Sequence, residues 1–211
     1  MKESKILDLI VLVPGADERE AIQELLHHRR ESLGIKELRF DIKVHPRRDP
    51  GCLTEAPDVL QVYASLAQHA LVIFDLEGSG AESKNREVLE ADLRDRLSKS
   101  GWTDRAEVIV IEPEFDVWAW SSSPHLDEAL GWKGRSPALR DWLLRKQLWP
   151  EGSRKPPRPK EALQAALRES RVRRSASVYR VIAEKVGIQD CREESFLKFR
   201  SILTTWFEKN H

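Results

Sequence analysis

The five consecutive apolar residues Ala70-Leu71-Val72-Ile73-Phe74, followed at once by Asp75, constrain the fold of this chain most. A run of this kind is typical of a strand buried on both faces of a parallel sheet. Such a sheet needs helices on both sides, because each face must be covered by apolar side chains. The sequence therefore predicts an α/β fold with this run as a central strand.

Three further segments read as strands, and helical patterns separate them. The strands are expected at 6–13, 38–44 and 106–111. Helices are expected from Asp17 to Leu33, over 55–68 after a turn at Asp49-Pro50-Gly51, and around 88–97. This alternation predicts a mostly parallel four-stranded sheet.

The second half of the chain is expected to be helical. Short helices are predicted after Ser123-Pro124 and Ser136-Pro137, and longer ones from Lys160, over 175–186 and over 195–207. The predicted organisation is an α/β domain over 1–120 followed by a helical lobe over 121–211, packed on the same domain.

Length and composition narrow the class of protein. A chain of 211 residues with 40% hydrophobic residues is long enough for a real core. Its longest apolar stretch is too short to cross a bilayer, so no membrane partner is expected. Cys52 and Cys191 lack metal-type spacing, and the N-terminus lacks a signal-peptide pattern, which favours a reduced, cytoplasmic protein.

The balance of 35 basic and 35 acidic residues hides two charged blocks. Residues 55–116 hold 14 acidic and six basic side chains, whereas residues 154–174 hold eight basic and two acidic ones. The pattern fits a metal site beside an anion-binding surface. It equally fits two surfaces that meet each other or a partner.

Polar residues follow the end of every predicted strand. In an open parallel sheet, ligands bind at the carboxyl ends of the strands. The residues in question are Gly15, Asp17 and Glu18 after the first strand; His45, Arg47, Arg48 and Asp49 after the second; Asp75 and Glu77 after the third; and Glu112, Glu114 and Asp116 after the fourth.

From this set we predict a magnesium site made of Asp75, Glu77 and Glu114, which would also be the catalytic carboxylates. Carboxylates are the oxygen ligands that Mg²⁺ prefers, and a bound Mg²⁺ polarises phosphate. The alternative is that Asp75 caps its loop, Glu77 faces water, and Glu114 pairs with the basic helices that follow.

A second predicted surface binds phosphate or nucleic acid. It comprises His45, Arg47 and Arg48 after the second strand, and Lys155, Arg158 and Lys160 in the basic linker. Arginine suits bidentate contacts with phosphate, and clustered cations follow a nucleic-acid backbone. Solvated loops, or a surface that meets a protein partner, explain the same residues.

The order of short motifs along the chain resembles the Toprim-like proteins. These motifs are Gly15-Ala16-Asp17-Glu18 after the first strand, Phe74-Asp75-Leu76-Glu77-Gly78, Glu114-Phe115-Asp116-Val117-Trp118, and Pro159-Lys160-Glu161 before the C-terminal helices. The family pattern has a glutamate directly after the first strand and D-x-D after the third. Here Pro14 occupies the position of the glutamate, and the longer Glu77 occupies the position of the second aspartate.

More narrowly, the chain resembles an accessory protein of the bacterial methylation-associated defence system. The segments that carry this likeness are His45-Pro46-x-x-Asp49-Pro50-Gly51-Cys52, Leu71-Val72-Ile73-Phe74-Asp75 and Lys155-Pro156-x-x-Pro159-Lys160-Glu161. The resemblance implies a Toprim-like scaffold with a partly degenerate acidic site in an anti-phage, restriction-modification-like system. Its implied partners are other subunits of that system, including a DNA methyltransferase, and DNA. The alternative function is a Mg²⁺-dependent nuclease or other phosphoryl-transfer enzyme.

Overall fold

The fold is built on a four-stranded parallel sheet. The computed structural model describes residues 6–120, 125–185 and 191–209. The strands are β1 (Leu7–Val13), β2 (Phe40–Val44), β3 (Ala67–Asp75) and β4 (Ala106–Ile111), in the spatial order β2-β1-β3-β4. All three neighbouring pairs are parallel, so the expected α/β fold with a parallel sheet is confirmed.

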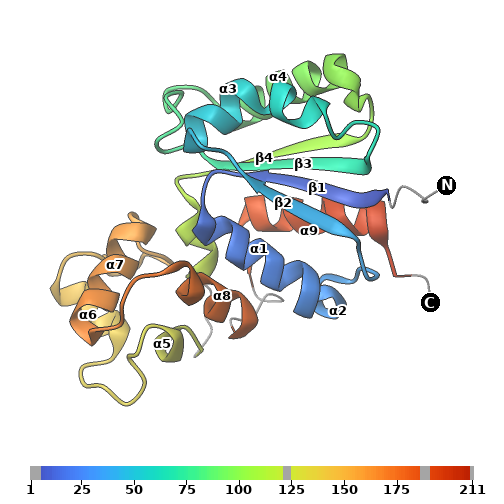
Figure 1. Cartoon of the computed structure of the whole chain (residues 1–211). Helices are drawn as coiled ribbons and strands as arrows, with labels where there is room; N and C mark the ends of the chain where they lie inside the picture. The colour runs from blue at the N-terminus through green and yellow to red at the C-terminus, as the bar shows by residue number, and fades with distance from the viewer. Residues whose placement is uncertain (1–5, 121–124, 186–190, 210–211) are drawn as a thin grey trace.

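Helices cover both faces of the sheet (Figure 1). α1 (Ala16–His28), α2 (Arg30–Leu33) and α9 (Glu194–Phe207) lie on one face, and α3 (Arg48–Gln61) and α4 (Arg86–Leu97) lie on the other. Alternate residues of β1 enter the two resulting cores, because successive side chains of a strand point to opposite faces. The double coverage explains why the β3 sequence is continuously apolar.

The rest of the chain after β4 is helical where the structure describes it. A 3-10 turn, η2 (Phe115–Ala119), precedes α5 (His125–Ala129), α6 (Leu139–Arg145), α7 (Pro159–Ser170) and α8 (Ala176–Lys185). α8 packs against α1, and α9 returns to the sheet beside β4. Side chains from both halves share one hydrophobic core, and the division at residue 120 stays a prediction.

Two helix starts differ from the expected positions. α3 runs from Arg48 to Gln61 and not over the expected 55–68, so Asp49-Pro50-Gly51 forms its first turn, and residues 67 and 68 belong to β3. Proline fits a first turn because its missing N–H has no partner to bond there. α6 begins at Leu139, two residues beyond the expected cap at Ser136-Pro137. The other expected cap, Ser123-Pro124, lies outside the described residues.

The outer edge of β4 is closed by two side chains. Glu90 of α4 accepts the Val110 N–H at 2.9 Å, and Lys198 of α9 donates to the Val108 carbonyl at 2.7 Å. Lys198 and Glu90 also form an ion pair at 2.8 Å, with the Glu90 side chain 9% exposed. The pair occupies two backbone groups of an edge that would otherwise be open to another strand.

No helix in the described parts of the chain is long and apolar enough to cross a membrane.

Removal of the Lys198 cation should destabilise the fold, because it leaves the buried Glu90 charge without a partner. We expect Lys198→Met to lower the free energy of unfolding by about 1–3 kcal/mol in urea denaturation. Adding Glu90→Gln removes the orphaned charge and should recover most of that loss. Lys99→Met, at an exposed lysine, is the matched control. A Lys198→Met variant as stable as the parent would contradict this account.

Candidate functional site at the carboxyl edge of the sheet

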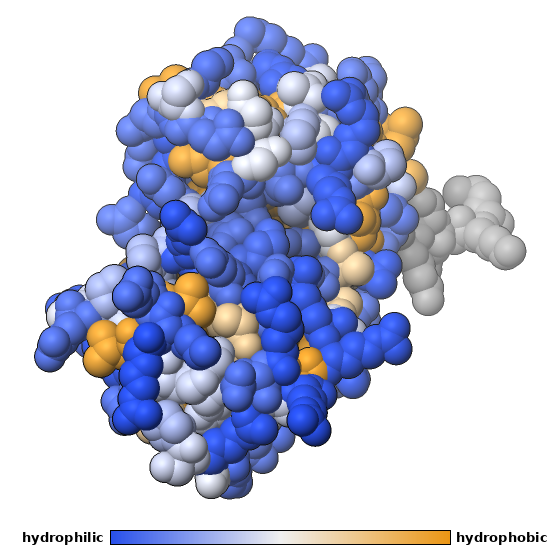
Figure 2. All heavy atoms as spheres, turned by 90° about the vertical axis from the view of Figure 1, so that its left-hand side faces the viewer, coloured by the Kyte–Doolittle hydropathy of each residue, from blue (hydrophilic) through white to orange (hydrophobic). Residues whose placement is uncertain are grey.

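A cavity of about 420 Å³ lies where the four strands end. Figure 2 shows the molecule from this edge. The surface is hydrophilic in the middle of the view, between the layer of α3 and α4 above and the helices α5 to α7 below. The chain leaves β1 toward one face and β3 toward the other, and ligands of open α/β sheets bind at such a divergence. The lining residues with ionisable side chains are Asp17, Glu18, His45, Arg48, Asp49, Asp75, Asp116, Lys160 and Arg174.

Four carboxylates in this cavity come from the ends of four different strands. Glu18 is in the first turn of α1, Asp49 in the first turn of α3, Asp75 ends β3, and Asp116 lies in η2. Within the described residues, none of the four has a cationic side chain within 4.0 Å. They form a group of buried and half-buried acids without direct ion-pair partners, which we call the acid cluster.

Burial raises the pKa of every member of the acid cluster. Loss of hydration raises the pKa of Glu18 to about 7, and the charges of Asp17, Asp49 and Asp116 add to this effect. The pKa of Asp116 rises to about 6, again chiefly through burial. The pKa values of Asp75 and Asp49 are raised for the same main reason. Near neutral pH the cluster therefore holds protons that exposed carboxyls would have released.

Backbone and side-chain hydrogen bonds fix these acids in place. Asp75 accepts the Phe115 N–H at 2.7 Å, and its own N–H donates to Asp49 at 2.9 Å. The Tyr179 hydroxyl donates to Asp116 at 2.8 Å. The starts of α3 and η2 are thus both tied to the end of β3.

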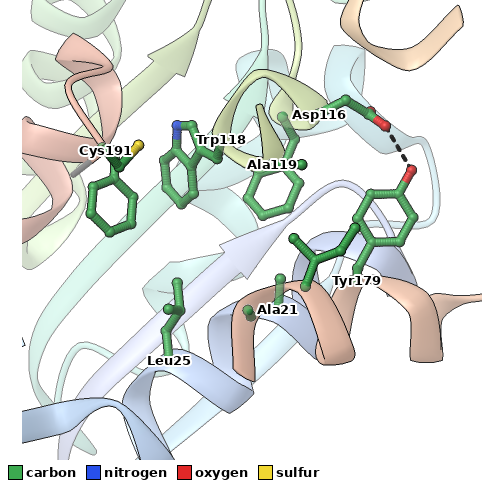
Figure 3. A pocket seen from close by; sticks show the side chains of 11 residues that line it. Ala21, Leu25, Asp116, Trp118, Ala119, Tyr179 and Cys191 are labelled. Carbon is green, nitrogen blue, oxygen red and sulfur yellow. Dashed lines mark hydrogen bonds between the residues drawn. The ribbon is translucent and has the colours of Figure 1, made fainter. Parts of the chain in front are cut away.

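An apolar hollow of about 50 Å³ lies behind Asp116 (Figure 3). Asp116 and Tyr179 stand at one end of it, and Cys191 and Trp118 stand at the other. The lining of the hollow is mostly apolar, and within it the Tyr179 hydroxyl donates a hydrogen bond to Asp116. The hollow accounts for part of the dehydration that raises the pKa of Asp116.

Two of the cations at the cavity, Lys160 and Arg174, are held by acids outside the acid cluster. Lys160 lies 3.3 Å from Glu114, which also accepts the Lys160 backbone N–H at 2.9 Å. Arg174 lies 2.9 Å from Asp17. These two cations thus pair with Glu114 and Asp17 and not with a member of the acid cluster.

The structure does not bring Asp75, Glu77 and Glu114 together as the expected magnesium ligands. Asp75 lies in the cavity, but Glu77 is exposed and Glu114 is turned to Lys160. The strand ends at Asp75, and Leu76 turns inward, so the alternation that would place residues 75 and 77 on one side stops. Within the described residues, no group of three or more His, Cys, Asp or Glu side chains is placed to hold a metal ion.

Three of the six expected phosphate-binding residues line the cavity and three do not. His45, Arg48 and Lys160 line the cavity. Arg47 instead pairs with Glu55, Lys155 donates to the Val117 carbonyl and pairs with Glu193, and Arg158 pairs with Glu161 at the surface.

His45 has a structural role as well as a place in the cavity wall. It is only 2% exposed, its Nδ1 accepts the Arg47 N–H, and its Nε2 lies 3.3 Å from Glu55. The ring packs so closely on α3 that a Cβ at Gly51 would lie 1.9 Å from Nδ1.

Sequence reasoning placed Glu18, Asp49 and Asp116 at strand ends but did not select them as site residues. Their signal was position alone, since each follows a strand within a few residues. Arg174, which lines the cavity, and Tyr179, which hydrogen-bonds Asp116, follow no strand, because they come from a segment about a hundred residues further along the chain.

Comparison of the chain with protein-family models, with curated proteins and with solved structures gave no match.

The raised pKa of Glu18 predicts a stability that falls as pH rises. The folded state holds this proton up to about pH 7, whereas the unfolded chain releases it near pH 4.5. The stabilisation of the folded state by this proton is thus fully present below pH 4.5 and is lost as the pH rises through 7. We expect Glu18→Gln to match the parent near pH 4.5 and to exceed its unfolding free energy at pH 8 by up to about 3 kcal/mol.

Denaturant titrations at several pH values test this expectation. Glu77→Gln is the matched control, because its side chain is exposed and it should change stability equally little at both pH values. A Glu18→Gln variant with a pH profile parallel to that of the parent would show that Glu18 titrates normally.

Proposed function

We propose that this chain is a divalent-cation-dependent enzyme that acts on phosphate esters of nucleic acid, with Asp75 at the centre of its site. The observation that supports this most is the acid cluster, four carboxylates that share a cavity without direct cationic partners. Buried charge without a partner is costly, and a bound cation would remove that cost.

The chemistry of the cavity suits Mg²⁺ together with a phosphate. Mg²⁺ is usually held by one or two carboxylates, several waters and the substrate's phosphates, so three preformed protein ligands are not required. Asp75 and the neighbouring Asp49 would supply the one or two carboxylate ligands. When bound, Mg²⁺ would withdraw charge from a phosphate oxygen and so favour attack at phosphorus.

The cations on the cavity wall would orient the phosphate. Arg48, Lys160 and Arg174 line the same cavity as Asp75. Glu114 and Asp17 hold two of them in place, so little side-chain freedom is lost when an anion binds. The remaining ligand-free carboxylates, with pKa values near 6 to 7, are suited to move a proton near neutral pH.

The Toprim-like resemblance agrees with this assignment in one further respect. Pro14 occupies the position of the family's glutamate after the first strand, but Glu18 lies in the same cavity as Asp75. We propose that Glu18 replaces the missing acid from one helical turn further along.

Metal binding should depend on Asp75 and not on Glu77. We expect calorimetry at pH 8 to detect Mg²⁺ or Mn²⁺ binding by the parent chain, and Asp75→Asn to weaken it at least about tenfold, since a ligand charge is lost. Glu77→Gln, which also removes one carboxylate charge after β3, should bind as the parent does. Affinity should fall from pH 8 to pH 6, because protons then compete for the acid cluster.

The same preparations, offered mixed single- and double-stranded DNA and RNA, test the enzymatic part. Cleavage that needs the metal and is lost in Asp75→Asn would support it. Equal metal binding by the two variants would overturn the site, and metal binding without any turnover would overturn the activity while leaving a ligand site.

We propose, as the cellular setting, an accessory subunit of a bacterial methylation-associated defence system. This setting rests on the resemblance, and Pro14 together with the outward-facing Glu77 favours a site altered from the family pattern. We expect the tagged chain to co-purify with a DNA methyltransferase or other products of its neighbouring genes. A chain recovered without any of them, at native expression level, would contradict the setting.

A further inference from the structure

The outer edge of β2 is open, in contrast to the closed edge of β4. β2 is the last strand on its side of the sheet, and no described residue pairs with its outer side. Four of its five residues are half-buried, and Val44 is 38% exposed. An open edge offers unpaired backbone groups to another strand.

The pairing with β1 determines which backbone groups of β2 face outward. The Arg39 carbonyl accepts the Leu9 N–H, and the His45 N–H donates to the Val13 carbonyl. Because successive residues of a strand direct their backbone groups to opposite sides, Asp41 and Lys43 also pair with β1. The N–H and carbonyl groups of Phe40, Ile42 and Val44 therefore face outward.

The β2 sequence is complementary to a second copy of itself in antiparallel orientation. With Ile42 opposite Ile42 of the second copy, Phe40 lies opposite Val44, and Asp41 lies opposite Lys43. The three apolar residues form the hydrogen-bonded pairs. The charged residues fall at the non-hydrogen-bonded positions, where facing side chains are closest.

The charged side chains already share one face of the strand. Lys43 lies 2.7 Å from Asp41, and its ammonium sits 5.5 Å from the centre of the Tyr63 ring. A second copy in this register would place an opposite charge beside each of them. Shifting the register by two residues would break both pairs.

A groove beside β2 leaves room for a side chain of a second copy. It has a volume of about 390 Å³ and lies between α1 and β2. Its lining is mostly polar, with Phe40 and Ile42 as its apolar part; the polar members are Arg19, Glu20, Gln23, His27 and Asp41. Antiparallel neighbours keep their side chains on matching faces, so Val44 of the second copy would extend along this groove.

We propose that two copies of the chain associate through antiparallel pairing of their β2 strands, which joins two four-stranded sheets into one continuous sheet. The arrangement is a two-fold symmetric, self-complementary interface. It is short, so the dissociation constant is expected on the order of micromolar. This inference is independent of the proposed function, because no residue of the acid cluster takes part.

Charge substitutions at the two facing positions test the proposal by sedimentation velocity over a concentration series. Lys43→Glu places an acid opposite Asp41 of the second copy, and Asp41→Lys places two lysines opposite each other. Each variant should weaken association by about tenfold or more, since two pairs per dimer become repulsive. An equimolar mixture of the two variants should restore it, because both facing pairs are then opposite in charge.

Matched controls separate the register from general charge effects. Lys99→Glu and Asp95→Lys make the same charge changes in an exposed ion pair away from β2, and both should associate as the parent does. The double variant Asp41→Lys/Lys43→Asp keeps complementarity within one sequence and should associate normally, even where a single variant folds poorly. A parent chain that stays monomeric up to about 1 mM would overturn the proposal. So would dimers unaffected by the single variants, or a mixture that does not associate.

Discussion

The burial of Asp75 at the end of the central strand is the constraint on which the carboxyl edge depends. This carboxyl is only 4% exposed, yet it has no cationic partner within ion-pair distance in the described chain. Hydrogen bonds connect it to Phe115 and Asp49, so the chain's exit from β4 and its entry into α3 are both positioned by the same residue. The cavity has its shape because three elements converge on one unneutralised acid.

The neighbouring cations are arranged so that they do not cancel this charge. Lys160 is bound to Glu114 and Arg174 to Asp17, and both acids lie outside the acid cluster. The observed pairing leaves the acid cluster and the cations as separate groups that line one cavity. That separation suits a ligand which contains both a metal cation and an anion.

The four strands could be predicted because each is an apolar run with a clear polar end. The fourth was expected at 106–111, as observed, and the others differ at one or both ends by one to three residues. The convergence of polar residues at the strand ends followed from parallel topology. Which of these polar residues enter the cavity could not be predicted, because that depends on where each strand stops. β3 ends at Asp75, so Glu77 lies in a turn. Glu114 precedes η2 and Asp116 lies within it, so the two side chains take different directions. Arg174 and Tyr179 required the packing of α8 on α1, which no local pattern encodes.

The two edges of the sheet bear on how the site would work in a dimer. Glu90 and Lys198 occupy two backbone groups of the β4 edge, whereas no described residue pairs with the outer side of β2. β2 runs into His45 and Arg48 of the cavity wall. Antiparallel pairing would direct the two carboxyl edges toward opposite ends of the joined sheet. Neither copy would then complete the site of the other, and each cavity would keep its own acids and cations.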